Sequence, residues 1–265
     1  MTSSNYTAIK LERDGHIATI KLNRPERMNA VNSVLADDFH RVLDEIAAEN
    51  DIRVVIITGE GRGFCAGADV NQMADSLEGK ANTFTSQYAS GVSPLAPHLR
   101  SIPQPVIAAV NGVAAGGGFG IALACDMRIA SEKARFGCVF VKRSLVPDTG
   151  TSYTTPGLVG MGVAMEMALT GNVYDAQWAL DKGLVNKVVP EENLMEEAFK
   201  LAEEISSNPP IAVRSIKQLM YSHSLDLDPV YKQERAANAP AANSEDRKEA
   251  VRSFVEKRQP VYKGI

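Results

Sequence analysis

Hydrophobic and polar positions alternate at the start of the chain and then recur at longer intervals. Over residues 8–23 the alternation surrounds the turn Asp14-Gly15 and predicts a β-hairpin. Residues 33–50 carry apolar side chains at helical spacing, which predicts an amphipathic helix with Ser33 as its N-cap. The segment "IRVVIITGEG", residues 52–61, is a β-branched run that ends in glycines. This pattern predicts a strand buried on both faces.

The middle of the chain repeats a strand, strand, helix order. The run "PVIAAV" at residues 105–110 predicts a second buried strand, and "GGFGIALAC" at 117–125 predicts the start of a helix. Two short strands are expected in "MRIASEKARFG", residues 127–137. The polar stretch at 75–93 has weak periodicity, so we expect a mobile loop or frayed helix near the ligand.

Helical patterns dominate after residue 153. They cover residues 163–171, 175–183, 192–206 and 244–258, and Ser244 is the expected N-cap of the last of them. The sequence therefore predicts an α/β core over residues 1–200 and a helical C-terminal segment over 201–265.

Composition narrows the function classes. The chain has 265 residues, 45% hydrophobic and 23% charged, which suits a globular protein with a full core. A net charge of −4 provides no overall basic field for nucleic acid or an anionic membrane surface. Residues 105–125 carry no charge, but their glycines and alanines are too weakly hydrophobic to predict a membrane span. The three cysteines form neither a disulfide framework nor a zinc motif, and no signal peptide opens the sequence, so we expect a cytoplasmic protein.

The glycine run "GVAAGGGFG", residues 112–120, lies between a predicted strand and a predicted helix. Glycines let a backbone approach a ligand closely, and a helix start offers unpaired N–H groups to an anion. The spacing does not fit a dinucleotide fingerprint, a Walker loop or a G-x-S-x-G elbow. A backbone oxyanion hole remains, unless the glycines only permit tight helix-strand packing. A second small-residue loop, "FCAGAD" at 64–69, could provide the other donor of a two-donor hole.

Four segments together resemble the enoyl-CoA hydratase/isomerase, or crotonase, superfamily: "LNRPERMNAVN", "GRGFCAGADV", "QPVIAAVNGVAAGGGFGIALACDMRIASEKARFG" and "GNVYDAQWALDKGLVNKVV". The resemblance spans residues 6–262. It implies an α/β fold built as a crotonase-like spiral of ββα units, with a helical C-terminal trimerisation segment. It also implies an acyl-CoA thioester substrate, a homotrimer or dimer of trimers, no metal, and no cofactor beyond the coenzyme A of the substrate.

The same resemblance assigns roles to individual residues. It implies that the backbone N–H groups of Ala68 and Gly117 hold the thioester oxygen. It also implies a border for the CoA nucleotide and pantetheine, with Phe254 and Lys257 reaching it from a helix. That border comprises Arg27, Met28, Ala30, Ala66, Asp69 and Val70.

The identity of the base decides the reaction. The positions of the two hydratase glutamates hold Gly120 and Phe140 here, which argues against water addition. Asp148, in "SLVPDTGTSY", resembles the single carboxylate of the isomerase branch. One base suffices for a Δ3,Δ2-enoyl-CoA isomerisation, because the same group can take a proton from C2 and return it to C4.

The motifs also leave room for functions besides isomerisation. By itself, Pro147-Asp148 is ordinary turn chemistry. The segment resembles 4-chlorobenzoyl-CoA dehalogenases too, but their histidine and tryptophan correspond to Ser93 and Phe140 here. A ring-expanding isomerase of aromatic acid breakdown, an enoyl-CoA hydratase and a non-enzymatic acyl-CoA-binding scaffold stay open as well.

Overall fold

Two β-sheets organise the molecule. The computed structural model describes residues 6–80, 86, 88, 91–222 and 227–261. The larger sheet has the order β1-β2-β3-β5-β7-β10 and is parallel except for the β1-β2 hairpin. Its strands are β1 Ile9–Asp14, β2 Ile17–Leu22, β3 Val54–Gly59, β5 Val106–Val110, β7 Met127–Ser131 and β10 Lys187–Val189. The smaller sheet has the order β4-β6-β8-β9, with β4 Gly63–Cys65, β6 Val113–Ala115, β8 Arg135–Gly137 and β9 Val173–Asp175.

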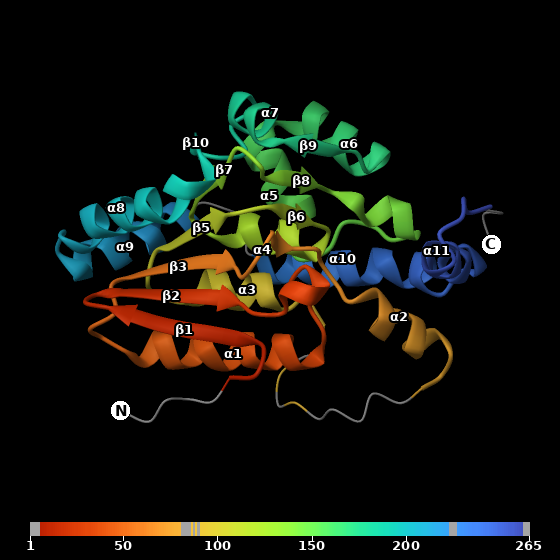
Figure 1. The fold of residues 1–265 in the computed structure, drawn as a ribbon, viewed down its shortest axis with the longest axis horizontal. Coiled ribbons are helices and arrows are strands. Elements are labelled where there is room, and N and C mark those ends of the chain that lie inside the picture. The colour runs from red at the N-terminus through yellow and green to blue at the C-terminus, as the bar shows by residue number, and fades with distance from the viewer. Residues whose placement is uncertain (1–5, 81–85, 87, 89–90, 223–226, 262–265) are drawn as a thin grey trace.

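The helices cover and separate these sheets (Figure 1). Their bounds are α1 Ser33–Ala48, α2 Val70–Leu77, α3 Leu95–Ser101, α4 Gly117–Ala124, α5 Thr151–Val159, α6 Met161–Thr170, α7 Ala176–Asp181, α8 Leu194–Ser206, α9 Pro210–Ser222, α10 Leu227–Ala242 and α11 Glu245–Val255. Short 3-10 turns occur at Pro25–Arg27, Val139–Arg143 and Glu191–Asn193.

Consecutive strands of the middle of the chain belong to different sheets. β3, β5 and β7 enter the larger sheet, and each is followed by β4, β6 or β8 of the smaller one. This arrangement confirms the predicted strand, strand, helix order. The sequence pattern predicts loops where β4 and β6 lie, and that prediction is wrong. Each of these strands has only three residues, which is too short to leave a period-2 pattern.

Two details near the first helix and the polar stretch also differ from expectation. The N-cap of α1 is Asn32 and not Ser33, because the Asn32 side chain accepts a hydrogen bond from Leu35 N at 2.9 Å. The stretch 75–93 begins inside a regular helix, since α2 continues to Leu77. Residues 81–85, 87 and 89–90 of that stretch lie outside the described residues.

The core lies on both faces of the larger sheet. On one face α8 packs against β2, β3, β5 and β7 through Leu194, Ala198 and Ala202. The other face belongs to a larger cluster that includes side chains of α1, α3 and α4. In Figure 1, α1 lies below the strands β1 to β3, and α8 lies above them at the left. The predicted boundary at residue 200 falls within α8, and the division into two segments stays a prediction.

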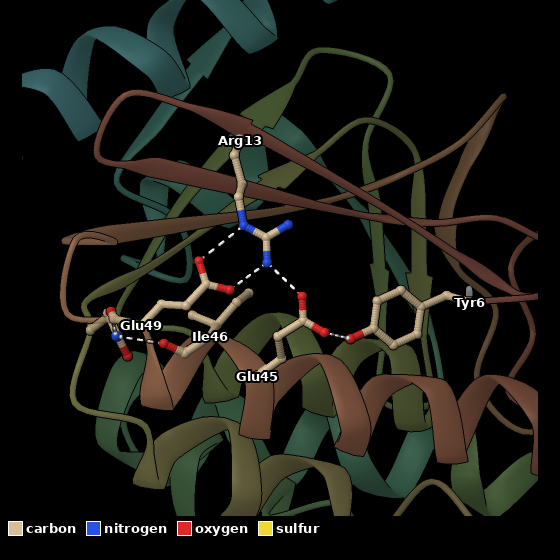
Figure 2. Close-up of polar contacts among 6 residues, drawn as sticks. Tyr6, Arg13, Glu45, Ile46 and Glu49 are labelled. Atoms are coloured by element: carbon tan, nitrogen blue, oxygen red, sulfur yellow. Dashed lines mark hydrogen bonds and ion pairs between the residues drawn. The ribbon is translucent and has the colours of Figure 1, made fainter. Parts of the chain in front are cut away.

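The N-terminal hairpin is joined to α1 by a surface ion network (Figure 2). Arg13 on β1 donates to Glu45 Oε1 at 2.6 Å and to both carboxylate oxygens of Glu49. Tyr6 Oη donates to the other oxygen of Glu45 at 2.6 Å. These contacts raise the pKa of Arg13, mainly through the hydrogen bond to Glu49. These contacts thus connect the hairpin to one face of α1.

Two contacts of the C-terminal helices with the rest of the molecule mark the two ends of this segment. Lys217 on α9 pairs with Asp126 Oδ2 at 3.0 Å, next to the start of β7. At the far end, α11 lies beside α2, and the predicted N-cap Ser244 is confirmed because it accepts a hydrogen bond from Arg247 N. Among the described residues, no helix has the length and hydropathy needed to cross a bilayer.

Candidate active site

The first small-residue loop follows β4. Gly67 has a positive φ of 92° there, a conformation that favours glycine. Val31 N donates to Gly67 O at 2.7 Å, and Asp69 N donates to Val31 O at 2.9 Å. These two bonds use the backbone on either side of Ala68. Within the described residues the Ala68 N–H has no hydrogen-bond acceptor.

The second loop joins β6 to α4. Gly116 has a φ of 52° and donates its N–H to Gly137 O at 3.0 Å. Gly117 is the first residue of α4, so its N–H has no partner within the helix. Among the described residues it also has no acceptor elsewhere. Each loop therefore presents one free amide.

The two loops touch each other. A Cβ atom placed on Gly67 would lie 2.7 Å from Ala115 O and 3.1 Å from Gly117 N. Standard bond lengths then put Ala68 N within about 7 Å of Gly117 N. A Cβ on Gly118 would lie 2.0 Å from Cys65 O, so this glycine serves close packing. Within the glycine run, Gly117 presents a free amide and Gly118 permits tight packing. Both interpretations of the run therefore apply, each to a different glycine.

A cavity of about 390 Å³ lies against these loops. It brings together almost all the residues that the sequence analysis singled out: Arg27, Met28, Ala30, Ala66, Ala68, Asp69, Val70, Gly117, Asp148 and Phe254. Lys257 is exposed just after α11 and does not line the cavity. The geometry therefore offers no support for a role of Lys257 within this chain's own cavity.

Asp148 lies in the turn before α5 and is half-buried at the cavity wall. Burial raises the pKa of its carboxyl, and hydrogen bonds from Thr149 and Ser93 act in the opposite direction. Phe140 lines the same cavity, as expected of an apolar neighbour, whereas Val146 is not in its wall. A carboxyl with a raised pKa is suited to accepting and returning a proton.

Asp69 has a structural role as well as a place in the wall. Its carboxylate pairs with Arg24 at 2.9 Å and accepts a hydrogen bond from Asn71 N at 3.1 Å, in the first turn of α2. Glu26, the other acidic residue in the wall, is exposed in the Pro25–Arg27 turn. Of the three carboxylates that the described residues bring to the cavity wall, only Asp148 is half-buried without an ion pair in the described part of the chain.

The positions of the hydratase glutamates are closed. A Cβ on Gly120 would lie 2.5 Å from Thr149 Cβ, so no larger side chain fits there without moving Thr149. Phe140 is buried and fills the second position with an aromatic ring. Neither position therefore supplies a carboxylate to the cavity.

Sequence reasoning missed several wall residues, notably Arg143, Val92, Met73, Leu145 and Val139. Arg143 has the clearest chemistry, because it adds a second cation to the wall beside Arg27. Its guanidinium lies 4.0 Å from the centre of the Phe254 ring on α11. A basic pair at residues 142–143, shortly before the predicted acid, was the available signal.

None of the described histidines, His16, His40 and His98, lines this cavity. His40 on α1 and His98 on α3 have their Nδ1 atoms 2.6 Å apart, a contact that their sequence positions did not suggest. Burial, followed by the charge of His98, lowers the pKa of His40 to about 4. His223 lies outside the described residues. Nowhere in the described ranges do three or more His, Cys, Asp or Glu side chains gather as metal ligands would.

Cys65 is fully buried beside the first loop, and burial raises the pKa of its thiol to about 12. A thiol in this state is not a nucleophile at neutral pH. This environment is that of a small core residue.

Comparison with known proteins identifies the family of this chain. A family model described as "Enoyl-CoA hydratase/isomerase" matches residues 12–265. The chain belongs to the enoyl-CoA hydratase/isomerase family. It is therefore an acyl-CoA enzyme of the crotonase superfamily, and its α/β architecture is the crotonase fold.

Three similar members of this family illustrate its range. The short-chain-enoyl-CoA hydratase of Clostridium acetobutylicum is 38% identical over 253 residues, covering 94% of this chain and 95% of that protein. The 1,2-epoxyphenylacetyl-CoA isomerase of Escherichia coli is 36% identical over 249 residues, again covering 94% and 95%. The crystal structure of an enoyl-CoA hydratase/isomerase from Pseudoalteromonas atlantica has a TM-score of 0.88 and 31% identity, covering 97% and 100%. Relatives of similar identity thus carry different activities.

Proposed function

We propose that this enzyme shifts a double bond in an acyl-CoA thioester from C3 to C2. The thioester oxygen accepts hydrogen bonds from Ala68 N–H and Gly117 N–H. Asp148 takes a proton from C2, the negative charge spreads to the thioester oxygen, and the same carboxyl returns the proton to C4. The reaction is balanced by this one proton and needs no cofactor beyond the coenzyme A of the substrate.

The observation that carries the proposal is the combination of two free amides and one carboxyl without a cation in the same cavity. The amides stabilise charge where it develops, and a donor of this kind typically contributes ~10²–10³ in rate. The general base contributes about 10²–10⁴. Water addition in the hydratase manner would need acids where Gly120 and Phe140 close the wall.

The same proposal assigns the remaining wall residues to the coenzyme. Backbone and side chains at Met28, Ala30, Ala66 and Val70 border the pantetheine. Arg27 lies in the wall with Arg143, where two cations favour the phosphates of coenzyme A.

Assembly as a homotrimer or dimer of trimers belongs to this proposal. Large apolar side chains on α6 and β9 are exposed in the single chain, which favours burial against a second copy: Met161, Met165, Leu169 and Val173. Light scattering coupled to size-exclusion chromatography measures the mass, and a monomer at working concentration would contradict the proposal.

Hydration is the second candidate, because relatives of similar identity include hydratases. The two reactions separate when the enzyme is given matched 3-enoyl-CoA and 2-enoyl-CoA substrates of several chain lengths. We expect conversion of the 3-enoyl-CoA to the conjugated thioester and little 3-hydroxyacyl-CoA from the 2-enoyl-CoA. Fast formation of 3-hydroxyacyl-CoA would favour hydration.

A label at C2 tests the single base. With deuterium at C2 of the 3-enoyl-CoA, part of the label should appear at C4 of the product in ordinary water, because one carboxyl carries it. Absence of deuterium at C4 in single-turnover experiments would indicate two separate groups or free exchange with solvent.

A further inference from the structure

Thr149, the residue after the proposed base, has an unusual backbone. Its φ is +54°, in the left-handed region that β-branched residues rarely adopt. It is also fully buried. Such a conformation persists only where the surrounding structure holds it, and it occurs preferentially at functional sites.

Gly120 on α4 makes room for this residue. A Cβ at position 120 would lie 2.5 Å from Thr149 Cβ, 2.7 Å from its Cγ2 and 2.8 Å from its main-chain oxygen. Thr149 therefore occupies a notch that only glycine leaves open. The turn is closed on the other side by Thr151, whose N and Oγ1 both donate to Asp148 O at 3.0 and 2.7 Å.

The side chain of Thr149 points back to the acid. Thr149 Oγ1 donates to Asp148 Oδ1 at 2.6 Å. The Ser93 hydroxyl, just before α3, lies near enough to the Asp148 carboxyl to lower its pKa. We propose that Thr149, seated in the notch at Gly120, is a positioning residue that fixes the Asp148 carboxylate by its hydroxyl, with Ser93 as the second tether. This inference rests on the proposed role of Asp148 as the base.

The two hydroxyls have a chemical as well as a geometric effect. A donor stabilises the carboxylate over the neutral acid, so each hydroxyl opposes the effect of burial on the Asp148 pKa. The charged side chains of the same cavity are Glu26, Arg27, Asp69 and Arg143, and none of them is among the causes of the shift. Removal of a tether should therefore both loosen the base and raise the pH at which it ionises.

Thr149→Val and Thr149→Ser separate the hydroxyl from the shape of the residue. Thr149→Val keeps the branched side chain, and we expect kcat to fall about 10- to 100-fold, as for a lost hydrogen bond to a charged group. KM should change little, and the midpoint of the pH-rate profile should move to higher pH. Thr149→Ser keeps the hydroxyl, so its kcat and the midpoint of its pH-rate profile should both match those of the wild type. Thr151→Val is the matched control, because its hydroxyl binds only the main chain of Asp148 and the midpoint should stay in place.

A titration that does not depend on turnover distinguishes this inference from the proposed function. Carbon-13 NMR of labelled aspartate follows the Asp148 carboxyl in each variant, with Asp148→Asn to assign its signal. A higher pKa of Asp148 in Thr149→Val and an unchanged pKa in Thr149→Ser support the inference. If the pKa of Asp148 stays at the wild-type value in Thr149→Val, the inference is wrong, whatever reaction the enzyme catalyses. If it shifts while turnover does not, the role of Asp148 as base is wrong instead.

Two further variants keep the inference testable if Thr149→Val fails to fold. Ser93→Ala removes the second tether without changing the strained residue, and the midpoint should again move to higher pH. Gly120→Ala should displace Thr149 and lower kcat. Its control is Gly157→Ala in α5, where an added Cβ meets no atom within 4 Å. Wild-type kcat and midpoint in both Ser93→Ala and Gly120→Ala would overturn the inference.

Discussion

Asp126 and Asp148 are two carboxylates with opposite environments in this fold. Asp126, between α4 and β7, accepts hydrogen bonds from Val106 N and Tyr221 Oη, both at 2.7 Å, and pairs with Lys217. Asp148 accepts a hydrogen bond from Thr149 Oγ1, pairs with no cation among the described residues, and lines a cavity. A fully paired carboxylate joins structural elements, whereas a half-buried one without a cation can still exchange a proton.

We expect the largest effect on stability when Asp126 loses its cationic partner Lys217. Lys217→Met leaves Asp126 with a buried, uncompensated charge, because the side chains are only 8% and 14% exposed. The free energy of unfolding should fall by about 3–5 kcal/mol, measured by urea unfolding. Lys80→Met, at an exposed lysine, is the control and should leave the midpoint of urea unfolding unchanged. A loss below about 1 kcal/mol would mean that the hydrogen bonds of Asp126 suffice and would weaken the comparison.

We expect a smaller effect of opposite sign, a gain in stability, when Asp148 is replaced by asparagine. Because burial raises the folded-state pKa of Asp148 above 3.8, its contribution to stability is full below that pH and is lost as the pH rises through the raised pKa. Asn carries no charge, so Asp148→Asn should melt at a higher temperature than the wild type at neutral pH. The difference should shrink as the pH falls toward 4. A lower melting temperature for the variant at neutral pH would contradict this account.

The smallest effect is expected at the surface network of Figure 2. Arg13→Met removes two ion pairs that water and salt screen, since the arginine side chain is 37% exposed. The cost should be at most about 1 kcal/mol and should decrease at high salt. Thermal unfolding at low and high ionic strength measures it. A salt-independent loss of several kcal/mol would show that exposed and buried pairs do not differ here as we describe.

Sequence patterns predicted the longer elements well, whereas the two predicted loops include the short strands β4 and β6. The strand before Gly59 and the helix from Ser33 carry enough apolar residues to show their period. The strands β4 and β6 are too short to show one. The helix α9 lies within the segment 201–265 that was predicted to be helical, but its own bounds were not predicted.

The sequence predicted the candidate site only in part, because local motifs do not encode contacts between distant segments. Motifs local in sequence indicated Ala68, Gly117 and Asp148, which line one cavity, but their roles stay predictions until tested. The contact of Ser93 with Asp148 joins segments 55 residues apart in the chain, and no local pattern encodes such a distance. The notch at Gly120 likewise depends on how α4 meets the turn before α5.

The turnover of two asparagine variants tests the central claim most directly. Asp148→Asn and Asp126→Asn are assayed with 3-enoyl-CoA below their unfolding temperatures, and binding of the acyl-CoA is measured separately. We predict that Asp148→Asn loses about 10²–10⁴ in kcat while it still binds the thioester, and that folded Asp126→Asn turns over like the wild type. Equal turnover of Asp148→Asn and the wild type would contradict the account.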